Sequence, residues 1–121
     1  MLPYEIGHGV KSTLAKTAVS PIDEMSLVFE AAAELFAMLS TPARLRILSS
    51  LCEREKNVSQ LLSEIDVSQS NLSQHLSAMY RVGILSKRRE GAMIFYTIRN
   101  QQAVTVCRSV CNQIAIDLDH Q

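Results

Sequence analysis

The chain has 121 residues, of which 47% are hydrophobic, and its twelve Lys and Arg residues balance twelve Asp and Glu residues. This length suits one domain with a modest core, and no apolar run reaches the roughly 18 residues of a membrane span. The zero net charge argues against a monomer that binds nucleic acid through overall basicity. The charges are unevenly distributed, however, because six basic residues and a single acidic one, Glu90, occur from Arg81 to Arg108.

The first nineteen residues differ from the rest of the chain. Residues 1–19 contain Pro3, Gly7 and Gly9, show little periodicity and lack the apolar run of a secretory signal. We expect them to form a flexible arm, followed by one folded domain from residue 20 to residue 121. The three cysteines, an odd number without the spacing of a disulfide framework, indicate the reducing cytoplasm.

Two helices are predicted next. Ser20 and Pro21 are typical of a helix start, because a capping serine and a first-turn proline precede acidic residues at the positive end of the helix dipole. Thr41 and Pro42 repeat this signal for a helix that runs to about Cys52. The apolar stripe of the first of these helices comprises Leu27, Ala31, Leu35 and Met38.

A short helix, a turn and a second helix follow. Ser59 is expected to cap the short helix, whose buried stripe comprises Leu61, Leu62 and Ile65. Asp66–Val67 forms the turn, and Ser68 caps the second helix, which ends before Gly83, a residue suited to the left-handed conformation. The apolar stripe of this second helix comprises Leu72, Leu76, Met79 and Val82.

The outward-facing residues of this second helix are polar, yet none from Ser68 through Tyr80 is a carboxylate. Amides and hydroxyls both donate and accept hydrogen bonds, so such a face can read base edges in the major groove of DNA. The alternatives are a merely solvated helix face and, for His75, packing at the helix–turn junction. The candidate DNA-reading residues of the two helices are Ser59, Gln60, Ser68, Gln69, Ser70, Asn71, Ser73, Gln74 and His75.

A two-stranded ribbon is predicted after the second helix. Its strands are Ile84–Lys87 and Ile94–Ile98, with Glu90–Gly91 in the connecting loop. Basic residues beside a polar helix are expected to contact phosphates, which supply affinity and orientation while the helix supplies sequence discrimination. The alternative is a basic strand edge that prevents mispairing. The candidate phosphate-contacting residues are Lys87, Arg88 and Arg89.

Asn100 is expected to cap a last helix with an apolar stripe at 3–4 spacing, formed by Ala103, Cys107, Val110, Cys111, Ile114 and Leu118. The first and last helices carry more apolar surface than the small DNA-reading part can cover. We therefore predict a homodimer through these helices, because two-fold dimers match palindromic double-stranded DNA with recognition helices about 34–36 Å apart. The alternative is a monomer that folds its outer helices together.

Two segments carry a resemblance to a known family. Leu39–Leu48 (LSTPARLRIL) and Ser68–Leu76 (SQSNLSQHL) resemble the second helix and the recognition helix of the ArsR/SmtB family of bacterial winged-helix transcriptional repressors. The resemblance extends over roughly residues 25–115. It implies a mainly α fold with a small β-hairpin, a winged helix-turn-helix in the order α-α-α-α-β-β-α. It also implies a homodimer that leaves its operator when an effector binds or a thiol changes state.

The metal sites of this family are expected to be absent. The zinc-type ligand positions along the last helix correspond to Asn100, Gln102, Gln113 and Ile116, whose side chains are poor ligands for Zn²⁺. The place of a second, Cys-x-Cys type of site is taken by Asn57–Gln60, which contains no thiol.

Thiol chemistry at Cys52, Cys107 and Cys111 remains, as in the sulfide- and oxidant-responsive relatives that this layout resembles. Residues four apart on a helix have Cβ atoms about 5–6 Å apart, whereas a disulfide requires about 3.5–4.5 Å. A disulfide or polysulfide is therefore expected between Cys52 and one of the other two, provided that their helices run antiparallel. The alternatives are arsenite or another thiophilic metal held by these thiolates, and cysteines that only pack. No cofactor is required.

Catalysis is not expected. Asp119 and His120 follow Cys111, but a helix end that frays provides neither a fixed base nor an oxyanion pocket. Besides a DNA-binding repressor in the cytoplasm, one function of another class stays open: a metal-sequestering or protein-interaction module without regulated operator binding. The polar face of the second helix favours the repressor.

Overall fold

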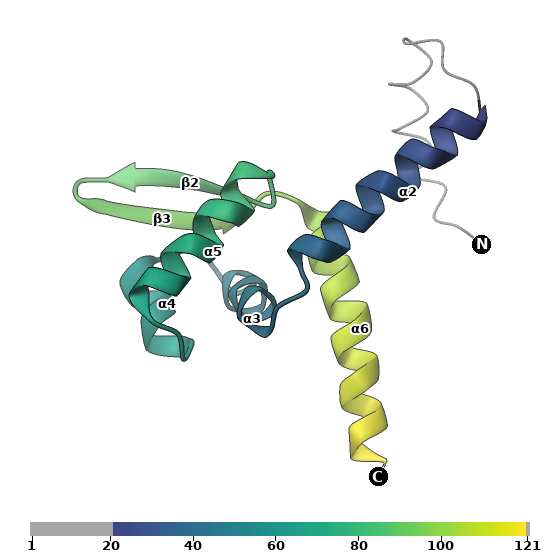
Figure 1. The fold of residues 1–121 in the computed structure, drawn as a ribbon. Coiled ribbons are helices and arrows are strands. Elements are labelled where there is room, and N and C mark those ends of the chain that lie inside the picture. Colours follow the sequence, from purple (N-terminus) through teal and green to yellow (C-terminus); the bar gives the residue numbers. More distant parts are fainter. Residues whose placement is uncertain (1–20, 121) are drawn as a thin grey trace. The chain divides into compact units, whose positions relative to one another are not determined.

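The computed structural model describes residues 21–120, which form helices and a small antiparallel sheet (Figure 1). In chain order the elements are α2 (Pro21–Met38), α3 (Pro42–Leu51), β1 (Lys56–Asn57), α4 (Val58–Glu64), α5 (Gln69–Arg81), β2 (Leu85–Glu90), β3 (Met93–Ile98) and α6 (Gln101–Asp119). The predicted winged helix-turn-helix order is confirmed, with β1 as an additional strand. The predicted arm, residues 1–19, and the capping Ser20 lie outside the described residues.

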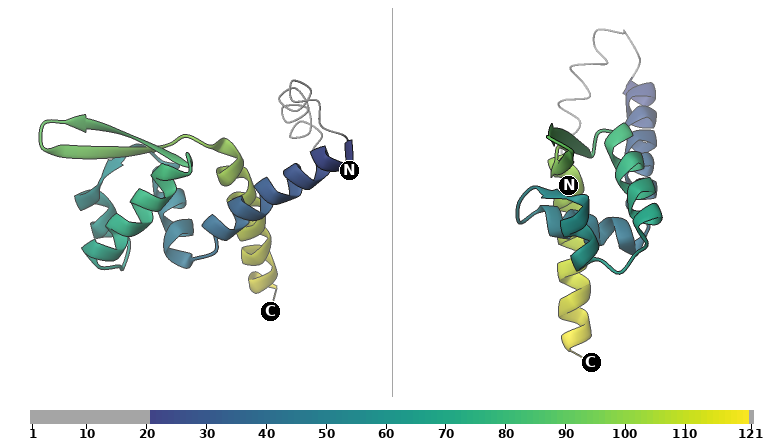
Figure 2. Two further views of the ribbon diagram at one scale, coloured as in Figure 1. Left: turned by 45° about the horizontal axis from the view of Figure 1, so that its top comes forward. Right: turned by 90° about the vertical axis from the view of Figure 1, so that its left-hand side faces the viewer.

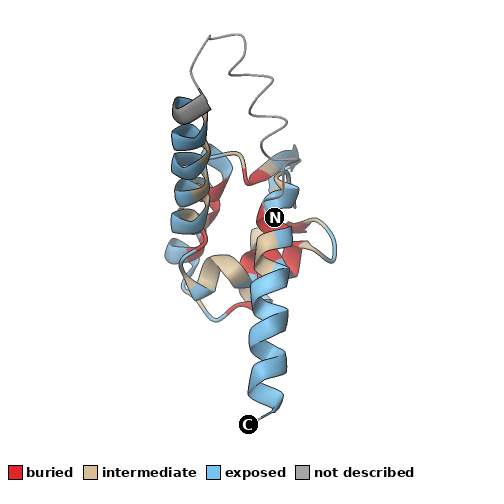
Figure 3. Cartoon of the chain, turned by 90° about the vertical axis from the view of Figure 1, so that its right-hand side faces the viewer, coloured by how far each residue is buried: buried red, intermediate tan, exposed pale blue. Residues whose placement is uncertain are grey.

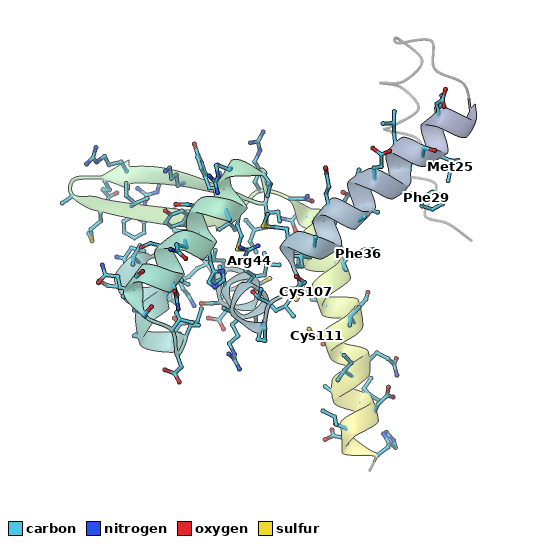
Figure 4. The ribbon with its side chains drawn as sticks, in the orientation of Figure 1. Met25, Phe29, Phe36, Arg44, Cys107 and Cys111 are labelled. Carbon is cyan, nitrogen blue, oxygen red and sulfur yellow. The ribbon has the colours of Figure 1, made fainter. Side chains whose placement is uncertain are left out.

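The chain divides into two units between Ala37 and Met38. In the first unit, α2 has Asp23 and Glu24 in its first turn, as the helix-start signal predicted. Four of its apolar side chains are exposed: Met25, Leu27, Phe29 and Phe36. Figure 4 labels Met25, Phe29 and Phe36. The second unit contains α3 to α6 and all the strands. A single domain over residues 20–121 stays a prediction.

Capping side chains fix where the helices of the second unit begin. The Thr41 hydroxyl accepts a hydrogen bond from the Arg44 amide at 3.2 Å, and the Ser68 hydroxyl accepts one from the Asn71 amide at 3.1 Å, as predicted. Asn100 also caps α6 as predicted, accepting from the Gln102 amide at 2.9 Å.

The start of α4 differs from the prediction that Ser59 caps it. Asn57 is the cap, because its side chain accepts from the Gln60 amide at 2.9 Å while the Gln60 side chain accepts from the Asn57 amide at 2.8 Å. This reciprocal pair satisfies two backbone donors at once. Ser59 lies within the first turn of α4, with its side chain exposed.

The core of the second unit lies among α3, α4, α5 and the sheet (Figure 3). Its largest apolar side chains are at most 1% exposed: Ile47, Leu48, Leu61, Leu72, Leu76, Met79, Ile84 and Leu85. Val82, predicted to continue the stripe of α5, is instead 55% exposed, because it follows the last turn of the helix. In α6 only Ala103 and Val104 are buried, so the second half of this helix is exposed.

The sheet has the order β1-β3-β2 and is antiparallel throughout. Leu85 pairs with Ile98 and Glu90 pairs with Met93, so β2 continues to Glu90, three residues beyond the predicted end at Lys87. The basic residues therefore belong to the strand. In Figure 1 and in the left view of Figure 2 the hairpin of β2 and β3 forms a wing, and Figure 1 shows its tip extending beyond α4 and α5.

Gly83 ends α5 with φ +83°, and a Cβ added there would meet no atom within 4 Å. We expect Gly83→Ala to lower the free energy of unfolding by about 1–2 kcal/mol, because only left-handed backbone strain opposes it. Chemical denaturation measures this change. Ser77→Ala, an exposed substitution within α5, is the control. An equal stability for Gly83→Ala and the wild type would contradict the backbone explanation.

Candidate nucleic-acid interface and thiol pocket

One side of α5 is buried and the other is exposed and polar. Leu72, Leu76 and Met79 anchor the helix in the core. Most of the predicted reading residues are exposed, namely Ser68, Gln69, Ser70, Asn71, Ser73 and Gln74. Since α5 contains no Asp or Glu, this surface offers hydrogen-bond donors and acceptors without repelling phosphates. On α4, Ser59 is exposed, whereas the side-chain carbonyl of Gln60 already accepts a hydrogen bond from the Asn57 amide.

His75 lies at the contact of α5 with α3. The Arg44 Nε donates a hydrogen bond to the His75 Nδ1 at 3.0 Å, so that Nδ1 is the unprotonated nitrogen and Nε2 carries the proton. Burial first, and then the Arg44 charge, lowers the pKa of His75. This geometry corresponds to packing of His75 at the helix–turn junction, the alternative to DNA contact, and leaves only Nε2 of His75 for DNA.

The lowered pKa of His75 predicts a pH-dependent stability. The folded chain favours the neutral form of His75. The contribution of His75 to the free energy of unfolding is therefore fully present above its ordinary pKa of about 6.5, and it is lost as the pH falls through the lower pKa of the folded state. We expect the free energy of unfolding to decrease between pH 7.5 and 5.5. His75→Gln should flatten this dependence, as measured by urea denaturation. Ser77→Ala, an exposed substitution on the same helix that changes no titratable group, is the control and should leave it unchanged. An unchanged slope in His75→Gln would refute the assignment.

The three basic residues of β2 have different surroundings. The Lys87 Nζ lies 4.3 Å from the centre of the Tyr80 ring, a cation–π distance. Arg88 lies over Phe95, its Nε donates to Glu55 at 2.9 Å and its Nη1 donates to Glu90 at 2.9 Å. These carboxylates raise the pKa of Arg88. Arg89 is exposed, and among residues 21–120 it forms no ion pair.

Arg88 must therefore exchange Glu55 for a phosphate if it is to hold DNA. We expect Glu55→Gln to strengthen binding, because Arg88 no longer has to break its ion pair with Glu55. The slope of log K against log salt concentration should stay at its wild-type value, because the number of neutralised phosphates is the same. Fluorescence anisotropy at several salt concentrations measures this slope. Glu30→Gln, the same charge change in α2, is the control, and an identical effect of both would argue for net charge alone.

A buried ammonium group, which sequence reasoning missed, joins β1 to α3 and α4. The Lys56 side chain is 0% exposed, and its Nζ donates to Ser50 and Glu64 at 2.8 Å and to Glu53 at 3.0 Å. The hydrogen bond with Glu64 raises the pKa of Lys56 and lowers that of Glu64. This cluster fixes the segment that carries Glu55. The i, i+3 spacing of Glu53 and Lys56 was its only sequence signal.

A pocket of about 500 Å³ lies between α3 and α6, and all three cysteines line it. Cys107 and Cys111 lie on α6 (Figure 4) with their sulfur atoms 3.8 Å apart, and all three thiols are free. Figures 1 and 2 show that α3 and α6 cross, so the antiparallel arrangement assumed from the sequence is wrong. The crossing nevertheless brings Cys52 to the same pocket.

Burial, together with the neighbouring thiols, raises the pKa of Cys107 to about 11. Cys107 is therefore a protonated thiol at neutral pH and a poor attacking nucleophile.

In the described part of the chain, no group of three or more His, Cys, Asp or Glu side chains is arranged to hold a metal ion. No helix among residues 21–120 is long and apolar enough to cross a membrane.

A helix with an exposed polar face (α5), a short helix packed against it (α4) and a basic wing define a winged helix-turn-helix DNA-binding protein. The family model described as "Bacterial regulatory protein, arsR family" matches residues 41–87. The chain belongs to this ArsR family of transcriptional regulators, as its resemblance to the family predicted.

The sequences of two relatives align with more than two thirds of this chain. The HTH-type transcriptional regulator Rv0081 of Mycobacterium tuberculosis is 36% identical over 98 residues, which are 78% of this chain and 86% of that protein. The transcriptional activator HlyU of Vibrio cholerae is 34% identical over 72% of this chain and 81% of its own length. Both relatives are named as regulators of transcription.

Solved structures agree with the fold. Reduced HlyU from Vibrio cholerae has a TM-score of 0.68 at 31% identity and covers 74% of this chain and 95% of that chain. The transcriptional repressor BigR from Xylella fastidiosa has a TM-score of 0.67 at 30% identity and covers 75% of this chain and 93% of that chain. One of these regulators is named an activator and the other a repressor, so membership of the family does not fix the direction of regulation.

Proposed function

We propose that this regulator is a homodimeric repressor, acting in the cytoplasm, that leaves a palindromic operator when a reactive sulfur species or an oxidant modifies its thiols. The observation that carries the proposal is the single pocket lined by Cys52, Cys107 and Cys111. Cys52 directly follows α3, which packs against the DNA-reading helices, and Cys107 and Cys111 lie on α6. A covalent link in this pocket would therefore change the orientation of α4 and α5, the two DNA-reading helices.

The dimer is supported by unburied apolar side chains. Among the described residues of α6, Val110, Ile114, Ile116 and Leu118 are each at least 50% exposed. In α2, Phe29 and Phe36 are 61% and 56% exposed. Because such surfaces mark interaction sites, we assign both helices to the contact between two copies of the chain.

On DNA, α5 lies in the major groove and the wing lies on the backbone. Base edges are read by the polar residues of α4 and α5: Ser59, Gln60, Ser68, Gln69, Ser70, Asn71, Ser73, Gln74 and His75. Lys87, Arg88 and Arg89 hold phosphates, after Arg88 has left Glu55. Two recognition helices about 34 Å apart then contact successive turns of the duplex.

Release follows from a bond between α3 and α6. Oxidation joins Cys52 to the exposed Cys111, rather than to Cys107, whose raised pKa keeps its thiol protonated, and the oxidant accepts the two electrons and two protons. A polysulfide donor instead supplies bridging sulfur atoms and accepts the same two electrons and two protons as it is reduced to sulfide or thiol. Either link pulls the helices together, which alters the spacing of the paired recognition helices. A coupling of about 1–3 kcal/mol would weaken operator binding about 5–150-fold.

Arsenite or another thiophilic metal is the second candidate effector. The sulfur atoms of Cys107 and Cys111 are 3.8 Å apart and already share one helix face, so a soft ion could bind between two thiolates. Binding must then deprotonate Cys107, whose pKa of about 11 opposes it. The thiol-modification mechanism does not need this step if Cys52 and Cys111 react.

The test uses Cys52→Ser and Cys111→Ser, with Ser49→Ala, which lines the same pocket, as control. We expect both Ser variants to bind the promoter fragment beside the gene as the wild type does, but to resist release by polysulfide and peroxide in mobility-shift assays. Mass spectrometry of the intact protein identifies the adduct: loss of two hydrogens, added sulfur or added arsenic. Release of both variants by every reagent would exclude the sensor. Absence of sequence preference in the wild type would favour an interaction or metal-sequestering module.

A further inference from the structure

A shallow hollow of about 480 Å³ lies beside α5, lined by Arg44, Ser73, Gln74, Ser77, Ala78 and Arg81. Its lining contains two guanidinium groups, two hydroxyls and an amide, and no carboxylate. Every polar side chain in it can donate a hydrogen bond. The composition therefore suits an anion.

Arg44 is held in place while part of its guanidinium stays available. Its Nε donates to the neutral His75 at 3.0 Å, and its Nη1 donates to the Met38 carbonyl at 3.1 Å. Neither acceptor is a charged carboxylate, and among residues 21–120 Arg44 forms no ion pair. Its charge is therefore not neutralised, and Figure 4 shows Arg44 where α3 meets α5.

The other donors of the hollow come from α5. Arg81 is the last residue of the helix and is exposed, and within the described chain it also forms no ion pair. Ser73 and Ser77 are exposed and four residues apart, so their hydroxyls lie on one helix face. Gln74, one of the predicted base-reading residues, lines the same hollow.

We propose that this hollow binds a phosphodiester group of the DNA backbone, next to the groove that α5 enters. The proposal rests on the proposed DNA-binding mode and adds Arg44 and Arg81 to it. The planar guanidinium fork matches two phosphate oxygens, and the serine hydroxyls supply further donors. Phosphate contacts of this kind fix the register of a protein on the duplex without reading sequence. His75 acts as a positioning residue for Arg44.

The experiment compares Arg44→Gln, Arg44→Lys and Arg81→Gln, in the full chain, on the promoter fragment and on a shuffled duplex at several salt concentrations. Each Gln variant should lose about tenfold in affinity for both duplexes, the size of one charge-assisted hydrogen bond. Its salt slope should decrease by about 0.9. Arg44→Lys should keep the slope and lose part of the affinity. Arg54→Gln, an exposed arginine outside the hollow, is the control and should bind as the wild type does.

These measurements distinguish a DNA phosphate from a free anion. They also distinguish failure of the phosphate site from failure of the proposed operator binding. Stabilisation of the wild type but not of Arg44→Gln by inorganic phosphate, with operator affinity unchanged, would assign the hollow to a free anion and overturn the proposal. An unaltered salt slope in Arg81→Gln, whose exposed position does not threaten folding, would overturn it as well. A wild type that binds the promoter fragment no better than the shuffled duplex would instead overturn the proposed operator binding.

Discussion

Replacing Asn71 and Gln74 together by Ala is expected to abolish preference for the promoter while leaving the fold intact. The two amides are three residues apart on the exposed side of α5, so they lie on one face. Side-chain amides pair with adenine through two hydrogen bonds, each such pairing being worth about 1–3 kcal/mol of discrimination. Loss of both should weaken promoter binding by about 2–6 kcal/mol, roughly 30-fold to more than 10⁴-fold.

The control for this double variant is Gln101→Ala with Gln102→Ala, which removes two exposed amides at the start of α6. Fluorescence anisotropy on the promoter fragment and on a shuffled duplex gives the specificity ratio. We expect the ratio to fall toward one in the Asn71/Gln74 variant and to stay at its wild-type value in the control. A preserved ratio in the α5 variant would show that another surface reads the sequence.

Leu76→Ala is expected to have the largest effect on stability. The Leu76 side chain is 0% exposed and holds the recognition helix against the core. Truncation of a buried leucine costs about 2–5 kcal/mol, because transfer free energy is lost and a cavity remains. Thermal or urea unfolding at one fixed protein concentration measures the loss.

Val82→Ala is the matched control, since Val82 directly follows the same helix but is 55% exposed. We expect it to change stability by no more than about 0.5 kcal/mol. If the two variants lose the same stability, α5 is not held by its buried stripe, and the orientation assigned to its polar face would be wrong.

Much of the second unit could be predicted from sequence, because local signals there agree with the packing. The capping residues Thr41, Ser68 and Asn100 and the positive φ of Gly83 were all predicted correctly. The cap of α4 was not, because Asn57 and Ser59 are both good caps and only the position of Gln60 decides between them. The strand β1 has two residues and shows no periodicity.

The parts of the candidate site that sequence could not supply depend on side chains distant in the chain. The pairs Arg88–Glu55 and Arg44–His75 join residues more than thirty positions apart. The cysteine pocket depends on how α3 and α6 cross, which no local pattern encodes. The sequence indicated which residue types were available, and the packing decided which of them meet.

In the proposed binding mode, the carboxylate-poor face of α5 and the basic wing bind DNA together. The most direct test of this mode is the affinity of the variant Gln74→Ala, Arg88→Ala, Arg89→Ala for the promoter fragment, measured by anisotropy across a salt series. We expect a loss of at least about 100-fold, since one amide and two guanidinium contacts disappear, together with a shallower salt slope. Promoter affinity and salt slope equal to those of the wild type would contradict it.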